Sequence, residues 1–272
     1  MEINKLKLGN TYLNSEICST FSCSLFAGMN KSNKTNSLVL ISNHVKSIYA
    51  DRWDGDALLY TGTGRSGDQT LKGNQNINLY ESDTNGLTVY LFEVFIEKQY
   101  VYQGIVALAA EPFQEEQYDK NDKLRKAWVF PLRLESSNKP IDRLLIEGAF
   151  ENKVRRISKK LSTKDLEKRA RNINTKVGVR KTFGKSFQRN PYVTAYTLRR
   201  AGRCCELCNN PAPFVKPNGE PYLEVHHIKH LAEGGYDTID NTVALCPNCH
   251  RKIHSLRLET DIDILLQIKK KV

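Results

Sequence analysis

The pattern of hydrophobic and polar positions divides the chain into a strand-rich first half and a second half with helical segments. Runs of strand length with β-branched or aromatic residues occur at 37–42, 57–60, 87–95, 100–109 and 127–134. Clusters of Gly, Asn and Asp separate these runs, and such clusters are typical of turns and loops. Because runs of this composition favour strands, residues 1–135 are predicted to form a β-rich domain.

The pattern changes after residue 135. A polar break with a proline ends the strand-rich region, and scattered apolar residues follow at Val154, Ile157, Leu161, Leu166 and Ile173. This arrangement predicts one or two helices, and Pro191 suits the first turn of another helix over 192–201. The pattern as a whole predicts an α+β protein with three parts: a β-rich domain at 1–135, a helical linker at 136–190 and a further domain at 191–272.

The net positive charge of the chain is concentrated in its middle segment. The 272-residue chain carries a formal net charge of +11. Residues 151–190 contain fourteen Lys or Arg and three acidic residues, so this segment alone accounts for +11 and the rest is neutral overall. A local cationic excess favours a polyanionic partner such as DNA. A solvated basic linker whose charges bind nothing specific is the alternative.

Cysteine usage points to metal binding rather than to disulfides. Four of the seven cysteines form two C-x-x-C pairs, and an odd total with this spacing favours a reducing compartment. The N-terminus lacks the apolar core of a signal peptide. No apolar run approaches the roughly 20 residues that span a bilayer. We therefore expect a cytoplasmic protein without a membrane partner.

The two C-x-x-C pairs, Cys205/Cys208 and Cys246/Cys249, predict a structural zinc site. Four thiolates fill the tetrahedral coordination of Zn²⁺ and leave no open position. Such an ion adds folding free energy to a segment too short for a large core. Cys204 competes with Cys205, but Cys205 is preferred because it leaves the two-residue gap before Cys208.

A group of histidines has the spacing of a second metal site. His226 and His227 are adjacent in a strand-like run, so their side chains point to opposite faces. His250 and His254 are four residues apart in a helix expected to begin near Pro247, which places both rings on one helical face. With His226 they provide three nitrogen ligands and leave a position open, which is typical of a catalytic ion.

Asn241 follows His227 by fourteen residues, beyond a Gly-Gly turn, and is expected to bond the ring of His227. In this order the residues resemble the ββα-metal motif of HNH endonucleases, with a four-cysteine zinc knuckle around it. The resemblance implies that His227 is the general base, that Asn241 orients it, and that His226, His250 and His254 hold the metal. It also implies phosphodiester hydrolysis that leaves a 5′-phosphate and a 3′-hydroxyl.

The type of ligand does not identify the catalytic ion. Imidazoles admit Mg²⁺ or Mn²⁺ but also suit Co²⁺, Ni²⁺ or Zn²⁺, and many HNH proteins have Asp where His226 stands. Residues 191–254 resemble most closely the nuclease half of McrA-type modification-dependent restriction endonucleases. The segments at 209–214 and 221–225 carry this closer likeness.

The N-terminal region resembles SRA (YDG) domains. The resemblance rests on the order of Gly28-Met29, the run at 37–40, Tyr49, Asp51, Gly55-Asp56 and Tyr60-Thr61-Gly62. It implies a twisted β-barrel that binds methylated or hydroxymethylated cytosine after flipping it out of the duplex. The pocket is predicted at Tyr49, Asp51, Tyr60 and Thr61, where tyrosine rings stack on the base and Asp51 accepts from its N4 amino group.

One departure from familiar SRA domains concerns the pocket. The interval from Tyr49 to Tyr60 is one residue shorter, which leaves open whether Asp51 matches the acidic pocket residue of the family. The alternative is that these tyrosines belong to the core and that Asp51 lies in a surface turn.

The combined prediction is a type IV-like restriction endonuclease. The SRA-like domain recognises 5-methylcytosine or 5-hydroxymethylcytosine in double-stranded DNA, and the HNH domain cuts. Since one HNH site cuts one strand, symmetry favours a homodimer. Two alternatives are an HNH homing or nicking endonuclease that reads unmodified DNA, and a methyl-DNA-binding protein with an inactive HNH module. The complete histidine and asparagine set argues against the latter.

Overall fold

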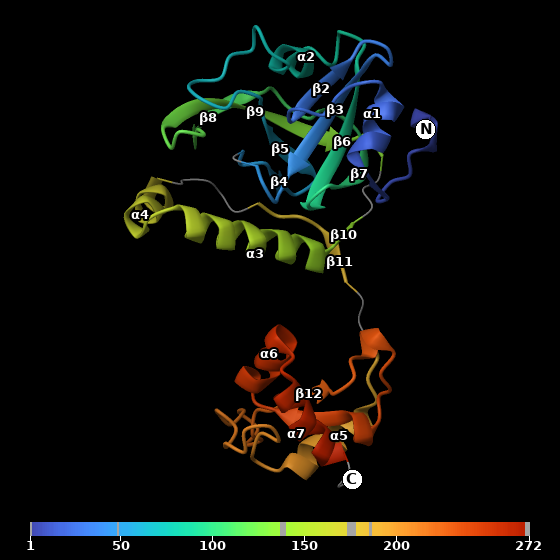
Figure 1. The fold of residues 1–272 in the computed structure, drawn as a ribbon, viewed down its shortest axis with the longest axis vertical. Coiled ribbons are helices and arrows are strands. Elements are labelled where there is room, and N and C mark those ends of the chain that lie inside the picture. Colours follow the sequence, from blue (N-terminus) through green and yellow to red (C-terminus); the bar gives the residue numbers. More distant parts are fainter. Residues whose placement is uncertain (1, 48, 137–139, 173–177, 185–186, 270–272) are drawn as a thin grey trace. The chain divides into compact units, whose positions relative to one another are not determined.

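The chain folds into two compact units, Met1–Gly184 and Lys185–Val272 (Figure 1). The computed structural model describes residues 2–47, 49–136, 140–172, 178–184 and 187–269. Its helices and strands confirm the predicted α+β class. Among the described residues, no helix is long and apolar enough to cross a membrane.

A mixed sheet forms the centre of the first unit. In the described residues it has nine strands, with the path β2-β3-β6-β7-β9-β5-β4, while β1 pairs with β7 and β8 with β9. The strands are β1 Thr11–Tyr12, β2 Met29–Ser32, β3 Ser37–Asn43, β4 Arg52–Asp54, β5 Ala57–Thr61, β6 Thr88–Ile96, β7 Gln99–Leu108, β8 Phe113–Tyr118 and β9 Leu124–Leu134. The five predicted runs are confirmed as β3, β5, β6, β7 and β9.

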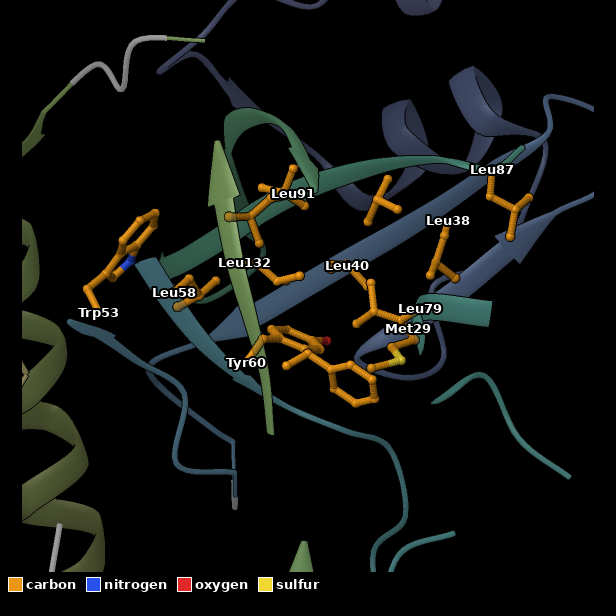
Figure 2. Close-up of a cluster of buried hydrophobic side chains, with 13 residues drawn as sticks. Met29, Leu38, Leu40, Trp53, Leu58, Tyr60, Leu79, Leu87, Leu91 and Leu132 are labelled. Atoms are coloured by element: carbon orange, nitrogen blue, oxygen red, sulfur yellow. The ribbon is translucent and has the colours of Figure 1, made fainter. Parts of the chain in front are cut away.

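Both faces of the central strands are buried. Leu38 and Leu40 of β3 belong to one cluster (Figure 2), whereas Val39 belongs to another on the opposite face. This division follows from the alternation of side chains along a strand. The second cluster is covered by helix α1 (Asn14–Phe21), which buries Ile17 and Phe21 against it. Residues Ile3–Lys5 form the short 3₁₀ helix η1.

The predicted base pocket lies in the connection between two neighbouring strands. β3 and β6 pair in parallel, so the chain between them must cross over rather than turn back in a hairpin. This crossover carries β4, β5, a long loop and helix α2 (Asn76–Tyr80). Inside it, Gln69 donates to the carbonyl of Gly62 and accepts from the N–H of Trp128, which fixes the loop against β9.

The described part of the predicted linker is folded onto the first unit. It forms β10 (Ile141–Asp142), α3 (Arg143–Lys160), α4 (Thr163–Asn172) and β11 (Thr182–Phe183). Ala149 of α3 is buried with Phe95, Val101 and Ile141 in a separate small cluster. The first compact unit therefore extends well beyond residue 135, where the sequence predicted its end. Ile173, one of the predicted helical positions, lies outside the described residues.

In its described residues, the second unit consists of a short two-stranded ribbon and three helices. They are α5 (Pro191–Ala201), β12 (Glu224–His227), β13 (Thr242–Leu245), α6 (Pro247–Leu256) and α7 (Glu259–Lys269), with 3₁₀ turns η2 (Leu231–Glu233) and η3 (Ile239–Asn241). The predicted helix after Pro191 is confirmed as α5, and Asn190 caps it by accepting from the N–H of Tyr192. Strands β12 and β13 are antiparallel, with His226 opposite Val243.

Candidate nuclease site and base pocket

Strand β12 and helix α6 bring three of the predicted histidines together. Ring nitrogens of His226, His250 and His254 all lie within 4.8 Å of one another. The His226 ring centroid is 5.0 Å from that of His250 and 4.9 Å from that of His254. The four-residue spacing along α6 places the last two rings on one helical face. The structure thus assembles the predicted ligand set of a metal site.

The chemistry of this histidine cluster fits a divalent ion. Nε2 of His226 is buried without a hydrogen-bond partner among the described residues, and Nε2 of His254 lies 3.1 Å from Nε2 of His250. Burial, followed by the neighbouring rings of His250 and His254, lowers the pKa of His226 to about 3. The ring is therefore neutral near pH 7, which is the form that binds metals.

Glu224 supports the cluster from its outer side. Its Oε2 lies 2.6 Å from Nδ1 of His250, and its Oε1 accepts from the hydroxyl of Tyr222 at 3.0 Å. The contact with His250 is the main cause that lowers the pKa of Glu224. A carboxylate on the far ring nitrogen fixes the tautomer of a ligating histidine. The sequence prediction missed Glu224, although its position two residues before His226 places both on one face of β12.

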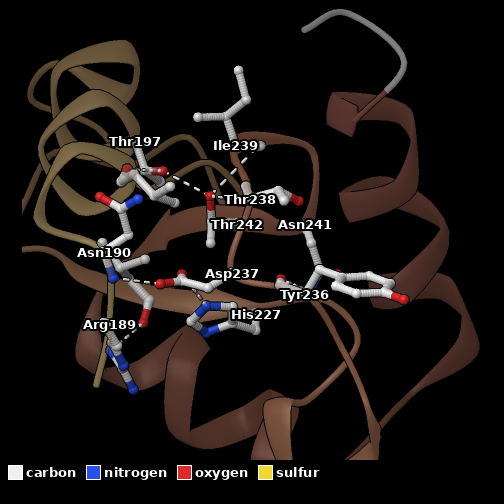
Figure 3. Close-up of polar contacts among 12 residues, drawn as sticks. Arg189, Asn190, Thr197, His227, Tyr236, Asp237, Thr238, Ile239, Asn241 and Thr242 are labelled. Carbon is white, nitrogen blue, oxygen red and sulfur yellow. Dashed lines mark hydrogen bonds and ion pairs between the residues drawn. The ribbon is translucent and has the colours of Figure 1, made fainter. Parts of the chain in front are cut away.

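His227 points to the other face of β12, as the alternation predicts. Its side chain is 5% exposed, and its Nε2 lies 2.8 Å from Oδ1 of Asp237 (Figure 3). The other oxygen of Asp237 accepts from the backbone N–H of Asn190 at 2.5 Å. Asp237 was also missed, because it lies in an irregular loop ten residues from His227 where no pattern marks a partner.

Asn241 holds a loop instead of the ring of His227. Its side chain accepts from the N–H of Lys229 at 2.9 Å and donates to the carbonyls of Lys229 at 3.0 Å and Tyr236 at 2.8 Å. In the described part of the chain, the ring of His227 bonds Asp237 where a contact with Asn241 was expected. Asn241 thus closes the segment between Lys229 and Tyr236.

The four predicted cysteines also converge. The sulfur atoms of Cys205, Cys208, Cys246 and Cys249 lie within 4.8 Å of one another, and Cys204 is exposed outside this group. Burial and then contacts with neighbouring thiols raise the pKa of Cys249. Four thiols this close ionise together only beside a compensating cation, so the donor set fits a structural divalent ion.

Asp51 and Thr61 meet in the first unit. The backbone N–H of Thr61 donates to Oδ1 of Asp51 and the hydroxyl of Ser42 donates to Oδ2, both at 2.9 Å. Burial raises the pKa of Asp51, and these two hydrogen bonds oppose that shift. Gln117 donates to the hydroxyl oxygen of Thr61 at 3.0 Å. Tyr49 is half-buried nearby, and its hydroxyl donates to the carbonyl of Gly64 at 3.3 Å.

Tyr60 does not present a face for a base. It is 1% exposed and packs among leucines in the main core cluster (Figure 2), and its hydroxyl donates to the carbonyl of Gly28 at 2.6 Å. Leu58 and Tyr60 share the inward face of β5 because they are two residues apart. The predicted stacking role of Tyr60 is therefore corrected to a core role, which was the alternative for the tyrosines.

Two family profiles match separate parts of the sequence. Residues 8–142 match the ScoMcrA-like SRA domain, and residues 205–256 match the HNH endonuclease. The chain joins an SRA domain to an HNH domain. The HNH match contains the histidine cluster, the cysteine cluster, Asn241 and Asp237. The SRA match ends just before α3, so the basic helices lie outside the matched residues.

Similar proteins add to this assignment. The chain is similar to the "Type IV methyl-directed restriction enzyme EcoKMcrA" of Escherichia coli K12, with 53% identity over 70 residues. These residues are 26% of this chain and 25% of the relative, so the match spans about a quarter of that protein.

Solved structures with similarity include the "Type IV phosphorothioation-dependent restriction endonuclease ScoMcrA". It is 19% identical with a TM-score of 0.41, and the match covers 98% of this chain and 63% of that one. An SRA domain of SUVH5 in complex with methylated CHH DNA is 23% identical with a TM-score of 0.38. That match covers 50% of this chain and 92% of the SUVH5 chain.

Proposed function

We propose that this protein is a modification-dependent, type IV-like restriction endonuclease. The SRA domain binds double-stranded DNA that carries 5-methylcytosine or 5-hydroxymethylcytosine by flipping the base, and the HNH domain hydrolyses phosphodiester bonds. The observation that carries the proposal is the convergence of three imidazoles on one side of β12, with the buried imidazole of His227 on the other side, within the HNH match. Such a set combines an open metal site with a general base.

Two metal ions belong to this proposal. His226, His250 and His254 would hold the catalytic divalent ion, which can be Mg²⁺, Mn²⁺, Co²⁺, Ni²⁺ or Zn²⁺. When bound, this ion supplies positive charge against the negative charge that develops on the phosphate. The four clustered cysteines would hold a structural Zn²⁺ that stabilises the small HNH core.

The remaining chemistry falls to the residues around β12. His227 accepts the proton of the attacking water, and its Nδ1 is the nitrogen for this task because Nε2 faces Asp237. Asn241 keeps the loop after Lys229 closed, so that the groups around His227 stay in place. The product then carries a 5′-phosphate and a 3′-hydroxyl.

The base pocket is proposed at Tyr49, Asp51 and Thr61. Although Asp51 already accepts two hydrogen bonds, a carboxylate has about four lone-pair sites, so it retains capacity for the N4 amino group of cytosine. Tyr49 provides an aromatic ring for stacking. Tyr60 supports this pocket from the core without touching the base.

The partners and setting complete the proposal. The protein acts on double-stranded DNA in the cytoplasm, and the basic helices α3 and α4 contact its phosphates. One HNH site cuts one strand, so cutting both strands calls for two copies of the chain in a homodimer.

Cleavage of matched DNA duplexes tests this proposal. Unmodified, 5-methylcytosine and 5-hydroxymethylcytosine duplexes of one sequence are incubated with the zinc-loaded protein and Mg²⁺ or Mn²⁺. We expect cutting of the modified duplexes, loss of cutting in His227→Ala, and loss of discrimination in Asp51→Ala. Asp56→Ala is the matched control, because Asp56 is exposed and pairs with the exposed Lys181.

Each result bears on a separate part of the proposal. Equal cutting of all three duplexes would refute the proposed recognition of modified cytosine. Full activity of His227→Ala would refute the proposed nuclease mechanism. Retained discrimination in a folded Asp51→Ala protein, judged by its thermal melting, would show that another acid reads the base.

A further inference from the structure

We propose that Asp237 is the positioning residue for His227, and that Asn241 acts on His227 through the loop that carries Asp237. This inference rests on the proposed function, in which His227 is the general base. Asp237 lies within the HNH match but carried no predicted role. Its side chain occupies the place on the ring of His227 where Asn241 was expected.

The contact between Asp237 and His227 is short and mostly removed from water. Oδ1 lies 2.8 Å from Nε2, and the two side chains are 21% and 5% exposed (Figure 3). Hydrogen bonds that involve an ionised group in such surroundings are stronger than neutral ones. Since Oδ2 accepts from the N–H of Asn190, both oxygens are engaged and the carboxylate has a fixed orientation.

The charge state of Asp237 determines which ring nitrogen carries the hydrogen. The N–H of Asn190, followed by the contact with His227, lowers the pKa of Asp237. An ionised carboxylate accepts hydrogen bonds and donates none. Nε2 of His227 must therefore carry a hydrogen, so that the form of the ring with a single hydrogen has its lone pair on Nδ1. Asp237 thus selects the tautomer that a general base requires.

The backbone on both sides of Asp237 is anchored. On one side, the carbonyl of Tyr236 accepts from the side-chain amide of Asn241 at 2.8 Å. On the other side, the carbonyl of Thr238 accepts from the hydroxyl of Thr242 at 3.0 Å, and Thr242 lies 2.8 Å from Thr197 of α5. Asp237 therefore sits between two fixed points, one of which is supplied by Asn241.

This arrangement gives Asn241 an indirect role. Its amide is engaged by the backbone of Lys229 and Tyr236. Loss of Asn241 would release the residue next to Asp237, and the carboxylate would lose its orientation. The effects of changing Asn241 and Asp237 should therefore overlap rather than add, as is the rule for residues in one network.

The test uses the full-length, metal-loaded protein and four variants. They are Asp237→Asn, Asp237→Ala, Asn241→Ala and the double alanine variant. Asp240→Asn is the matched control, because it removes the same charge from an exposed residue three positions away. The measurements are kcat and KM for modified DNA, the affinity for Co²⁺ from its absorption spectrum, and the ¹⁵N shifts of the His227 ring, which report its tautomer.

We expect Asp237→Asn to lower kcat by roughly 10- to 100-fold, the usual loss when an outer carboxylate partner of a site histidine is removed. KM and Co²⁺ affinity should stay near those of the unchanged protein. The ¹⁵N shifts should move from the Nε2–H form toward a mixture, because an amide both donates and accepts. The double alanine variant should be about as slow as the slower single variant.

Several outcomes would overturn the inference. One is wild-type kcat in Asp237→Asn while His227→Ala is inactive, which would leave the nuclease proposal intact. Another is an unchanged His227 tautomer, a readout that does not require cleavage and so holds even if the proposed function fails. Equal losses of Co²⁺ affinity and kcat would show that Asp237 merely supports the fold. Full activity of His227→Ala would instead refute the proposed function.

Discussion

Glu93 is a carboxylate buried completely in the centre of the first unit. Its oxygens contact Nε2 of His44 at 2.8 Å and the indole N–H of Trp53 at 3.0 Å. The guanidinium of Arg180 binds both oxygens, at 2.9 and 2.6 Å, and stacks over the ring of Trp53. This one residue therefore ties the segment after α4 to the sheet.

Acid should weaken the first unit through Glu93. Burial by itself raises the pKa of Glu93, but His44 and Arg180 outweigh it and lower the pKa from 4.5 to about 2. A carboxyl with a lowered folded-state pKa contributes stability above pH 4.5 and loses it as the pH falls toward 2. We expect the free energy of unfolding of the full chain, measured with urea, to decline over this window.

Glu93→Gln should remove this dependence and cost roughly 3–5 kcal/mol near neutral pH, because Arg180 is left buried without its partner. The matched control is Glu97→Gln. Glu97 forms an exposed pair with Lys46 at 2.8 Å, and such surface pairs contribute about 0–1 kcal/mol. Similar losses in the two variants would contradict the role given to Glu93.

At the scale of single elements, strand β12 separates two tasks. Glu224 and His226 share one face, beside His250 and His254, whereas His227 faces Asp237. In the proposed mechanism, the alternation of side chains along this four-residue strand would separate the metal ligands from the general base. Its pairing with β13 fixes this division, since a shift by one residue would exchange the two faces.

Glu224→Gln should weaken the proposed catalytic metal site without disturbing the cysteine cluster. An amide in place of the carboxylate no longer fixes the tautomer of His250, so Co²⁺ affinity should fall by roughly 10- to 100-fold. Calorimetric titration measures this affinity, and zinc content should be unchanged. Tyr222→Phe is the milder comparison, because it removes one hydrogen bond to Glu224 and leaves the contact with His250. Unchanged Co²⁺ affinity in Glu224→Gln would rule out this supporting role.

The strands that the hydrophobic pattern did not predict were missed for related physical reasons. β2 and β8 are rich in polar residues and contain no apolar run, and β1 and β4 have two and three residues. Each of these strands forms because a neighbouring strand offers hydrogen bonds. For example, β8 pairs with β9 at six positions. Single-strand patterns do not contain that information.

At the scale of the whole molecule, the described part of the basic stretch belongs to the first compact unit. Arg180 binds Glu93 and α3 packs against β6, so the described basic helices are held with the SRA domain. Exposed cations such as Arg155, Lys159 and Lys160 are available for DNA phosphates. We therefore expect α3 and α4 to strengthen DNA binding of every sequence and modification to the same degree.

The salt dependence of DNA binding tests this expectation. Changing Arg155, Lys159 and Lys160 together to Gln should reduce the slope of log K against log salt by about 0.9 for each phosphate that is no longer neutralised. The ratio of affinities for modified and unmodified duplexes should stay constant. The control changes Lys5, Lys7 and Lys34, exposed residues of the same unit. An equal effect of both sets would mean that overall charge, not this surface, attracts DNA.

The sequence by itself determined the features that depend on local spacing. Two C-x-x-C pairs, a histidine pair on a strand and an i, i+4 pair on a helix predicted two clusters, and the structure assembles both. Apolar runs predicted the central strands, because burial on both faces requires them. These signals are readable because the chemistry demands particular residues at fixed distances along the chain.

Only the tertiary structure decided which polar residues support these features. Glu224 meets His250 across 26 positions, and Arg180 meets Glu93 across 87. Asp237, rather than Asn241, bonds the ring of His227, and Tyr60 turns into the core rather than toward the pocket. Such partners depend on how strands and loops pack in space, and a carboxylate or a tyrosine has the same local pattern whichever way it points.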